Sequence, residues 1–290
     1  MVSKNRPLTL PLMGGLGNQL FQFAAGIYLS KFSSKEVRFS VFGLLLLKNT
    51  SRTYMLGDLL KQSDVTARGR IKMAVIKLVS FLFPSVWISE NDLSDDPLSR
   101  VTNATKVAIG YFQREKYVDS VATELIQSMS QSNTFRSLIS EREYNEIAVH
   151  IRIGDYLSNS DAKKFHGLSA MTYFVNAVNH LQSFHRYDKI VIYSDDLSKA
   201  YSDFTEAFGP NDTPVVGSGG SSELEDLAGI SASRGIVISN STFSWWAAWI
   251  GTQLHTCDVV APRPWFANPS PADDNLLPDR WMVMSRELQP

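Results

Sequence analysis

Short apolar runs alternate with longer amphipathic stretches along the second half of the chain. The runs have the length and composition of buried strands, and they cover residues 147–151, 189–193, 214–216, 235–238 and 258–261. Helical spacing of apolar residues follows four of these runs, at 171–184, 197–208, 223–233 and from about 243 onward. This alternation predicts a parallel sheet with helices on both faces.

The first half of the chain has a less regular pattern. A strand at 8–12 enters the glycine-rich segment MGGLGNQ, and a helix at 20–31 and a strand at 37–42 follow. A strand at 107–109 and a long helical stretch at 118–139 are also expected. Because the charged run 141–146 separates the two patterns, we predict two domains, 1–143 and 144–290.

The most apolar segment, 71–88, is interrupted by Lys72, Lys77 and Pro84, and so it does not have the pattern of a membrane-spanning helix. Basic residues lie beside apolar ones in it. We interpret it as a helix that faces the core and exposes its lysines. The alternative is peripheral contact with an anionic membrane, on the inner face of the cell membrane.

Composition narrows the class of protein. The chain has 290 residues, 44% of them hydrophobic, and a net charge of −1, so a broad nucleic-acid-binding surface is not expected. The single cysteine, Cys257, excludes an intrachain disulfide framework and fits a reducing compartment. The N-terminus lacks the apolar core of a signal peptide, and the five histidines lack zinc-site spacing. We therefore expect a cytoplasmic protein.

Polar residues gather where three of the predicted strands end. The clusters are HIRIGDY (150–156), YSDD (193–196) and the four small residues 239–242. Because ligands of open parallel sheets bind at the carboxyl ends of the strands, we expect one crevice lined by all three clusters. The third cluster lies between a strand and a helix, where backbone N–H groups bind anions. The alternative is that it only caps the helix.

Each residue in these clusters has either a functional role, in ligand binding or catalysis, or a purely structural one. Arg152 can bind two phosphate oxygens through its guanidinium group, or it can form an interdomain salt bridge. Asp155 can orient Arg152, bind a hydroxyl or act as a base, or it can be an ordinary turn residue. His150 is either a buried structural histidine or a ligand contact. Asp195 and Asp196 can bind the ligand or cap the next helix.

The glycine-rich segment near the N-terminus resembles a dinucleotide-binding loop, but Leu20 replaces the third glycine of that motif. A dehydrogenase is therefore the weaker interpretation. The segment still allows close approach of a ligand to the backbone, and Asn18 and Gln19 add side-chain donors. The chain contains no Asp-x-Asp triplet, so we expect no bound metal and no cofactor.

Taken together, these motifs resemble the bacterial α-1,2-fucosyltransferase family. MGGLGNQLFQFAAG resembles its N-terminal glycine motif, and HIRIGDY resembles its H-x-R-R-x-D signature. HGLSAMTYFVNAV, YSDD, the long segment SELEDLAGISASRGIVISNSTFSWWAAWIG and VVAPRPWF resemble further motifs. The resemblance runs nearly from end to end.

The resemblance implies an α/β, GT-B-like fold of two Rossmann-like domains facing across a cleft, an acceptor-side domain followed by a donor-binding domain. It implies transfer of L-fucose from GDP-L-fucose, with inversion and without metal, to a terminal β-galactoside in O-antigen or oligosaccharide biosynthesis. Arg152 and Asp155 take catalytic positions. The implied donor-binding residues are Gly15, Gly17, Asn18, His150, Arg152, Ser194, Asp195, Asp226, Asn240, Ser241 and Thr242.

Within this set, the resemblance places His150 and Asp226 near the guanine and Ser241 and Thr242 at the diphosphate. The leaving diphosphate needs Arg152 and helix-start N–H groups when no metal is present. The attacking hydroxyl needs a base, for which Asp155 competes with acidic residues of the first domain. The sequence predicts neither the exact acceptor glycan nor an oligomeric state.

The chain departs from the family signature at Ile153, where the family has a second arginine. In an alternating strand end, Ile153 points to the same face as Ile151, so we expect it to pack in the core. Two alternatives follow from this departure. The donor is another GDP-deoxysugar such as GDP-colitose, or the protein binds nucleotide sugars or glycans without turnover.

Overall fold

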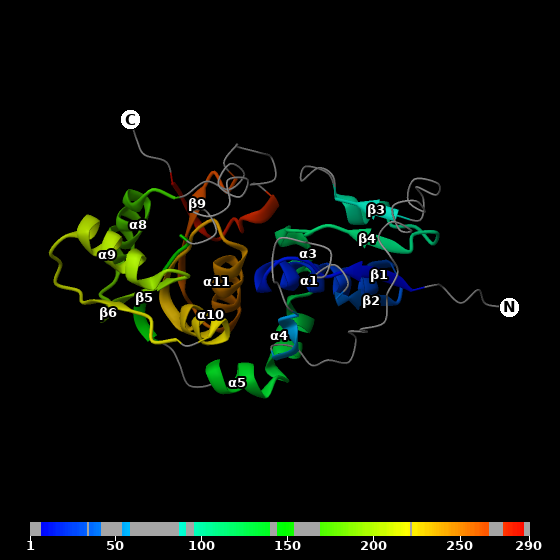
Figure 1. The fold of residues 1–290 in the computed structure, drawn as a ribbon, viewed down its shortest axis with the longest axis horizontal. Helices are drawn as coiled ribbons and strands as arrows, with labels where there is room; N and C mark the ends of the chain where they lie inside the picture. Colours follow the sequence, from blue (N-terminus) through cyan, green and yellow to red (C-terminus); the bar gives the residue numbers. More distant parts are fainter. Residues whose placement is uncertain are drawn as a thin grey trace. The chain divides into compact units, whose positions relative to one another are not determined.

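The computed structural model describes residues 7–33, 35–41, 54–58, 87–90, 96–139, 144–153, 169–220, 222–266 and 275–286. They belong to two compact units, Met1–Ser132 and Asn133–Pro290, and each unit has its own parallel sheet (Figure 1). The division precedes the predicted boundary at 143/144, because helix α5 (Asn133–Ile139) packs against helix α10 of the second unit.

The sheet of the second unit has the strand order β10-β9-β8-β5-β6-β7, with every neighbouring pair parallel. Its strands are β5 (Tyr144–Ile151), β6 (Lys189–Ser194), β7 (Val215–Gly217), β8 (Ser233–Val237), β9 (Asp258–Arg263) and β10 (Met282–Ser285). The chain moves outward from β5 to β7 and then returns to the other side of β5 with β8. The strand order therefore reverses between β5 and β8, which is the position where such sheets bind ligands.

Described helices cover both faces of this sheet (Figure 1). They are α8 (Met171–Phe184) and α9 (Leu197–Phe208) on one face, and α10 (Glu223–Ala232) and α11 (Thr242–Leu254) on the other. Under α8 and α9, alternate residues of β5 form a core with the apolar faces of the helices: Ile147, Val149, Ile151, Phe174, Val178, Leu181 and Phe204. The expected sheet with helices on both faces is confirmed.

Helix α11 is apolar on almost all sides and is buried accordingly. Its three tryptophans, Trp245, Trp246 and Trp249, are fully buried, and successive rings meet edge to face. The aromatic residues of this helix therefore pack in the core. The polar turn before α11 is also largely buried, and Thr242 is its partly exposed residue.

The first unit has a sheet of strand order β2-β1-β4-β3, also parallel. Its strands are β1 (Leu8–Pro11), β2 (Val37–Ser40), β3 (Trp87–Ser89) and β4 (Val107–Ile109). Its helices are α1 (Leu16–Ser33), η2 (Leu56–Asp58), η4 (Pro97–Arg100), α3 (Glu115–Asp119) and α4 (Ala122–Ser130).

Two expectations for the first half were wrong. The stretch 118–139 is not one helix, since α3, α4 and α5 are separated by turns, and the Ser120 hydroxyl donates to the Lys116 carbonyl at the first of them. The end of the segment 71–88 forms strand β3 instead of a helix. The rest of that segment, for which membrane contact was the alternative interpretation, lies outside the described residues.

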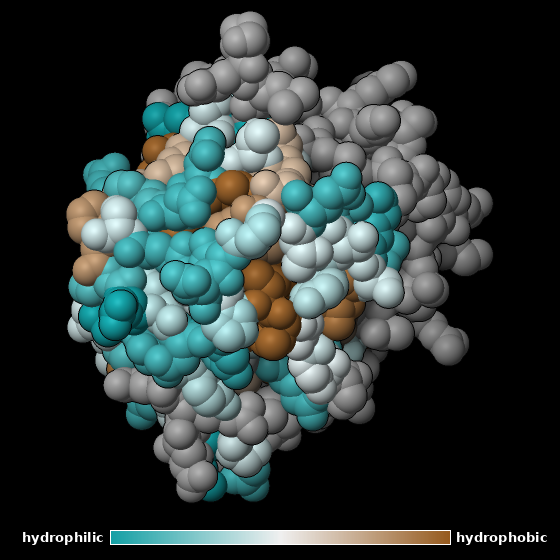
Figure 2. Space-filling view, turned by 90° about the vertical axis from the view of Figure 1, so that its left-hand side faces the viewer, coloured by the Kyte–Doolittle hydropathy of each residue, from teal (hydrophilic) through white to brown (hydrophobic). Residues whose placement is uncertain are grey.

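No helix among the described residues is long and apolar enough to span a membrane. Figure 2 views the side of α8 and α9, where hydrophilic residues predominate and apolar residues show as separate patches. Phe184 and Tyr201 are the large apolar side chains that these two helices expose.

Candidate functional site

The carboxyl ends of β5, β6 and β8 bring the three predicted polar clusters together. In the sheet, Ile151 pairs with Ser194 and Val149 pairs with Val237, so the residues that follow each strand meet at one edge. This edge includes the reversal of strand order between β5 and β8. The described residues of the three clusters therefore lie at one edge of one sheet, and the expected crevice stays a prediction.

Arg152 is oriented by Asp195. One carboxylate oxygen, Oδ2, lies 3.2 Å from the Arg152 Nε, and the other, Oδ1, accepts a 2.9 Å hydrogen bond from the Ile153 N–H. The two side chains are 23% and 28% exposed, so the pair lies at the edge of the protein interior. Because Asp195 holds Nε, it fixes the plane of the guanidinium group. The pair lies within the second unit.

Asp195 therefore contacts protein groups with both oxygens, and its expected donor contact stays a prediction. The neighbouring residues have separate tasks. Ser194 accepts a 3.1 Å hydrogen bond from the Asp196 N–H, and Asp196 caps helix α9 by accepting from the Lys199 N–H. The capping interpretation is confirmed for Asp196.

His150 is a buried histidine that links β5 to the turn after β8. Its Nδ1 lies 2.9 Å from the Ser239 hydroxyl, and its ring centroid lies 5.4 Å from that of Phe243. Burial lowers the pKa of His150 to about 3; the charge of Arg152 adds to this effect, and Asp195 opposes it. His150 is therefore neutral at physiological pH.

The polar turn 239–242 is held from several sides. The Asn240 side chain is buried; it donates to the Trp265 carbonyl over 3.2 Å and accepts from the Ser169 hydroxyl over 3.5 Å. The Ser244 hydroxyl donates to the carbonyls of Ser239 and Ser241. These contacts fix the backbone of the turn, so Asn240 contributes to its shape whatever it contacts besides.

Ser241 is the N-cap residue of α11, yet its side chain makes no capping hydrogen bond. Helix α9 is capped by Asp196 and α10 by Ser222. The first-turn N–H groups of α11, which begins at Thr242, are thus not satisfied in the usual way. Such groups, together with the positive end of the helix dipole, bind anions.

Asp226 lies in the first turn of α10, beside the loop that follows β7. Its Oδ1 is buried without a hydrogen-bond partner. A Cβ atom on Gly220 would lie 2.2 Å from this oxygen, so only glycine allows the loop to pass so close. Burial raises the pKa of the Asp226 carboxyl, and the Ser218 hydroxyl opposes the rise. Asp226 is thus a partly buried acid in a first turn that Ser222 caps, and its expected guanine contact stays a prediction.

In the first unit, α1 begins at Leu16 and not at 20, so Gly17 and Asn18 lie in its first turn and Gly17 is buried there. Only the segment up to Gly15 precedes the helix. Gly14 has a φ of +76°, and a Cβ atom on it would lie 2.5 Å from the Asn18 Nδ2. Glycine is required at position 14 for both reasons.

Asn18 and Gln19 have protein partners. Gln19 is buried; it donates to the Gly14 carbonyl and accepts from the Met55 N–H. The Asn18 Oδ1 accepts a 2.8 Å hydrogen bond from Gln113. Gln19 was expected to offer donors to a ligand, and it instead fixes the segment in front of α1.

Two expectations about the site, the role of Asp155 and the absence of a metal, stay predictions. Asp155, with His166 and Leu168 of the adjacent motif, lies outside the described residues. No group of three or more potential metal ligands occurs in the part of the chain that the structure describes. The expectation of a metal-independent reaction stays a prediction.

Ile153 packs in the core of the second unit, as expected from its alternation with Ile151. Its side chain is buried among the residues of β5, α8 and β6. It cannot take the place of the arginine that the family signature has at this position.

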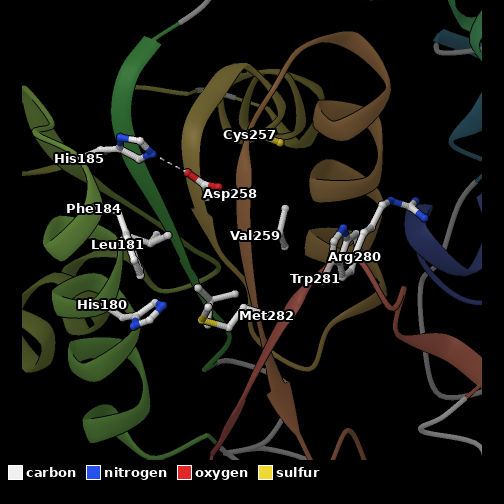
Figure 3. A pocket seen from close by; sticks show the side chains of 11 residues that line it. His180, Leu181, Phe184, His185, Cys257, Asp258, Val259, Arg280, Trp281 and Met282 are labelled. Atoms are coloured by element: carbon white, nitrogen blue, oxygen red, sulfur yellow. Dashed lines mark ion pairs between the residues drawn. The ribbon is translucent and has the colours of Figure 1, made fainter.

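The described residues also form a groove of about 620 Å³ at the opposite edge of the second sheet (Figure 3). The end of α8, with Leu181 and Phe184, and the first residues of β9 and β10 line it. His185 Nε2 lies 3.4 Å from the Asp258 carboxylate within it. No sequence pattern predicts this groove, because its lining residues are spread over about a hundred positions between His180 and Met282. Its position at the amino ends of the strands separates it from Arg152.

The sequence matches the profile of glycosyl transferase family 11 over residues 2–284. The chain belongs to this family. The identification made from the glycine motif, HIRIGDY and the segment before α11 is thereby confirmed.

Two Escherichia coli proteins are among the relatives. The O-antigen biosynthesis glycosyltransferase WbnK is 28% identical over 93% of this chain and 98% of its own. An α-1,2-colitosyltransferase is 27% identical over 95% of this chain and 98% of its own. The fucosyltransferase NodZ from Bradyrhizobium, at 12% identity and a TM-score of 0.50, covers 84% of this chain and 94% of its own. The protein is a glycosyltransferase of α/β, GT-B-like fold.

Proposed function

We propose that this protein transfers L-fucose from GDP-L-fucose to the 2-hydroxyl of a terminal β-galactoside, with inversion and without a metal, in O-antigen or oligosaccharide biosynthesis. The observation that carries the proposal is the pairing of an oriented Arg152 with the uncapped start of α11 at the strand-order reversal. A cation and free backbone donors at one position suit a diphosphate.

The leaving group is the first requirement of this reaction. Negative charge grows on the diphosphate as the sugar–oxygen bond breaks, and groups fixed in advance stabilise it best. Arg152 is fixed by Asp195, and the turn before Thr242 is fixed by Asn240 and Ser244. Ser241 and Thr242 add hydroxyl groups at the same turn.

The guanine base is the second requirement. Its N1–H and exocyclic amine offer two parallel donors, and a carboxylate accepts both. The Asp226 Oδ1, buried without a partner, is our candidate acceptor. Adenine lacks this pair of donors, so the site would prefer GDP to ADP. The buried His150 lies beside the diphosphate turn and, being neutral, adds no charge.

A second candidate donor is GDP-colitose. One relative is named an α-1,2-colitosyltransferase. Colitose lacks one hydroxyl that fucose carries, so its recognition needs one polar partner fewer. Ile153 lies in the core where the family signature has an arginine, and this is the observation that favours the smaller set of polar contacts.

The deciding experiment incubates the purified protein with GDP-fucose or GDP-colitose and a panel of β-galactosides. GDP release and the linkage of the product by NMR are measured. We expect GDP release that depends on the acceptor and an α-1,2 product from GDP-fucose. Faster release from GDP-colitose would favour the second donor. Tight GDP binding without release from either donor would instead indicate a binding protein without turnover.

A further inference from the structure

Arg263 is the last residue of β9 and lies at the carboxyl edge of the second sheet. The residues before it, 259–262, are buried, whereas Arg263 is exposed. Its backbone is fixed by the edge strand β10, because it pairs with Ser285 and its carbonyl accepts a 3.1 Å hydrogen bond from the Arg286 N–H. The side chain therefore reaches solvent from a fixed strand end, at the edge where open parallel sheets bind ligands.

Arg263 and Arg152 project from the same face of this sheet. Successive residues of a strand alternate between its two faces. Val260 belongs to the core under α8 and α9, so Arg263, three residues later, points to the face that α10 and α11 cover. Arg152 shares the face of His150, whose ring centroid lies 5.4 Å from that of Phe243 in α11. Both arginines are thus directed to the side of the sheet on which α11 begins.

The two arginines also lie at the same level along the strands. The sheet pairs Val149 of β5 with Val237 of β8, and Val237 with Val260 of β9. Arg152 and Arg263 each follow three residues after these paired positions. Because β8 runs between β5 and β9, two strand spacings, roughly 10 Å, separate the two backbones. The polar turn 239–242, which follows β8, lies between the two arginines.

Direct contacts hold this turn against the end of β9. The Asn240 side chain donates a 3.2 Å hydrogen bond to the carbonyl of Trp265, two residues after Arg263. On the other side of the turn, the segment after β5 contains Arg152 but no second arginine, since Ile153 packs in the core. A second guanidinium group at this turn can therefore come from β9.

The proposed guanine site lies on the opposite side of Arg152 from β9. A Cβ atom on Gly229, one helical turn after Asp226, would lie 2.5 Å from the Tyr193 hydroxyl of β6, so this part of α10 packs over β6. Along the carboxyl edge the strands follow in the order β6, β5, β8, β9. A donor with its guanine at Asp226 and its diphosphate at Arg152 therefore extends toward Arg263.

We propose that Arg263 binds the phosphate farther from the guanosine, the phosphate that carries the sugar. This inference rests on the proposed function. When the bond from the sugar carbon to the oxygen of this phosphate breaks, the oxygen keeps the electron pair and GDP leaves. A cation fixed beside that phosphate stabilises the growing charge. Arg263 thus supplies from β9 the second guanidinium group that the family signature supplies from the position of Ile153.

The competing interpretation is that Arg263 serves only contacts within the protein. A guanidinium group can donate two parallel hydrogen bonds to phosphate oxygens, whereas a lysine offers a point charge and an amide offers none. The series Arg263→Lys and Arg263→Gln therefore separates a need for positive charge from a need for side-chain bulk. Arg234→Gln, at an exposed arginine of the amino edge, is the matched control.

Titration calorimetry with GDP and GMP tests the proposal, because GMP lacks the phosphate assigned to Arg263. We expect Arg263→Gln to weaken GDP binding roughly 10-fold or more, the usual effect of losing a charge-assisted hydrogen bond. Its affinity for GMP and its thermal midpoint should stay at the wild-type values. Arg263→Lys should bind GDP more tightly than Arg263→Gln, and Arg234→Gln should bind both nucleotides like the wild type.

Kinetics provide a second readout. The value of kcat/KM for the GDP-sugar should fall in Arg263→Gln by at least the factor lost in GDP affinity, because the charge on this phosphate is larger in the transition state.

Unchanged GDP affinity in Arg263→Gln would overturn the proposal, and a lower thermal midpoint in the same variant would then assign Arg263 to contacts within the protein. An equal loss of GDP and GMP affinity would overturn the assignment to the sugar-bearing phosphate. If the wild-type protein itself neither binds GDP nor transfers a sugar, the proposed function fails, and this failure is distinguishable because it appears without any substitution.

Discussion

At the scale of single residues, the proposed chemistry rests on Arg152 and Asp195. From the sequence alone, we could predict only that Arg152 and Asp195 each follow a strand. The structure adds that they form an ion pair and that Asp195 also holds the backbone N–H of Ile153. The carboxylate thus couples the orientation of the guanidinium group to the end of β5. An arginine oriented before the substrate arrives needs no reorganisation during the reaction.

We predict that Arg152→Ala lowers kcat a few hundred-fold or more, corresponding to about 3–5 kcal/mol of lost transition-state stabilisation. Asp195→Asn should lower the same constant by a smaller factor, because the guanidinium group remains but is less well oriented. Steady-state kinetics on the folded variants measure both. Arg234→Ala, at the opposite edge of the same sheet, should have wild-type kcat. Near-normal turnover in Arg152→Ala would remove the proposed role of this residue.

His150 gives a prediction about stability. Its folded pKa of about 3 lies below the ordinary value of 6.5, so the unfolded chain binds a proton that the folded protein does not between these pH values. Stability should therefore fall as the pH drops from 6.5 toward 3. The variant His150→Gln, which cannot titrate, should lose less over this window.

Denaturant unfolding at several pH values between 7.5 and 4 measures this difference in slope. The expected sign follows from burial of a neutral imidazole beside Arg152, which disfavours the charged form. Equal slopes for the wild type and His150→Gln would show that the histidine is protonated in the folded protein.

At the scale of elements, the position of helix α11 determines where the proposed diphosphate-binding turn lies. Its apolar surface is buried all round, so its position is fixed by packing, and its first turn is presented at the edge of the sheet. Ser241 lies at the cap position but makes no capping bond. In the proposed reaction, the N–H groups and the helix dipole provide the stabilisation that a metal provides in other enzymes. The element therefore predicts metal independence.

We therefore predict that transfer persists at an unchanged rate in excess EDTA. GDP release with and without chelator, after dialysis against EDTA, is the measurement. Complete loss of activity that manganese or magnesium restores would contradict this prediction. A partial loss that no divalent ion restores would point to an effect of the chelator itself.

Element boundaries show which signals the sequence carries. Helices α8 and α9 begin and end where the apolar spacing predicts, because each buries one apolar face against the sheet. Strand β10 had no such signal, since its residues are mostly exposed at the edge of the sheet. Helix α1 begins four residues early because Gly17 and Asn18, which look like loop residues, occupy its first turn.

At the scale of the whole molecule, two edges of one sheet compete as binding sites. The carboxyl edge has Arg152 and the start of α11, whereas the amino edge has the groove between α8 and the starts of β9 and β10 (Figure 3). The carboxyl edge has the cation and the backbone donors that a nucleoside diphosphate requires.

We predict that GDP slows amide hydrogen exchange at the carboxyl edge, in peptides covering 150–153, 194–196 and 239–244. Peptides from the amino edge, covering 180–185 and 257–260, should exchange at unchanged rates. Exchange followed by mass spectrometry, with ADP as the control nucleotide, measures both. Protection confined to the amino edge would move the nucleotide into the groove and overturn the proposed site.

The sequence by itself determined the family, the parallel sheet of the second unit and the strand ends at which polar residues gather. Those features depend on residues close together in the sequence, because apolar periodicity and motifs are local patterns. It also determined that Ile153 packs, because alternation fixes the face of a strand residue. Only the tertiary structure decided that Asp195 orients Arg152 and that Asp226 has a buried oxygen without a hydrogen-bond partner. Those contacts join residues tens of positions apart, and their partners and burial exist only once the strands are placed side by side.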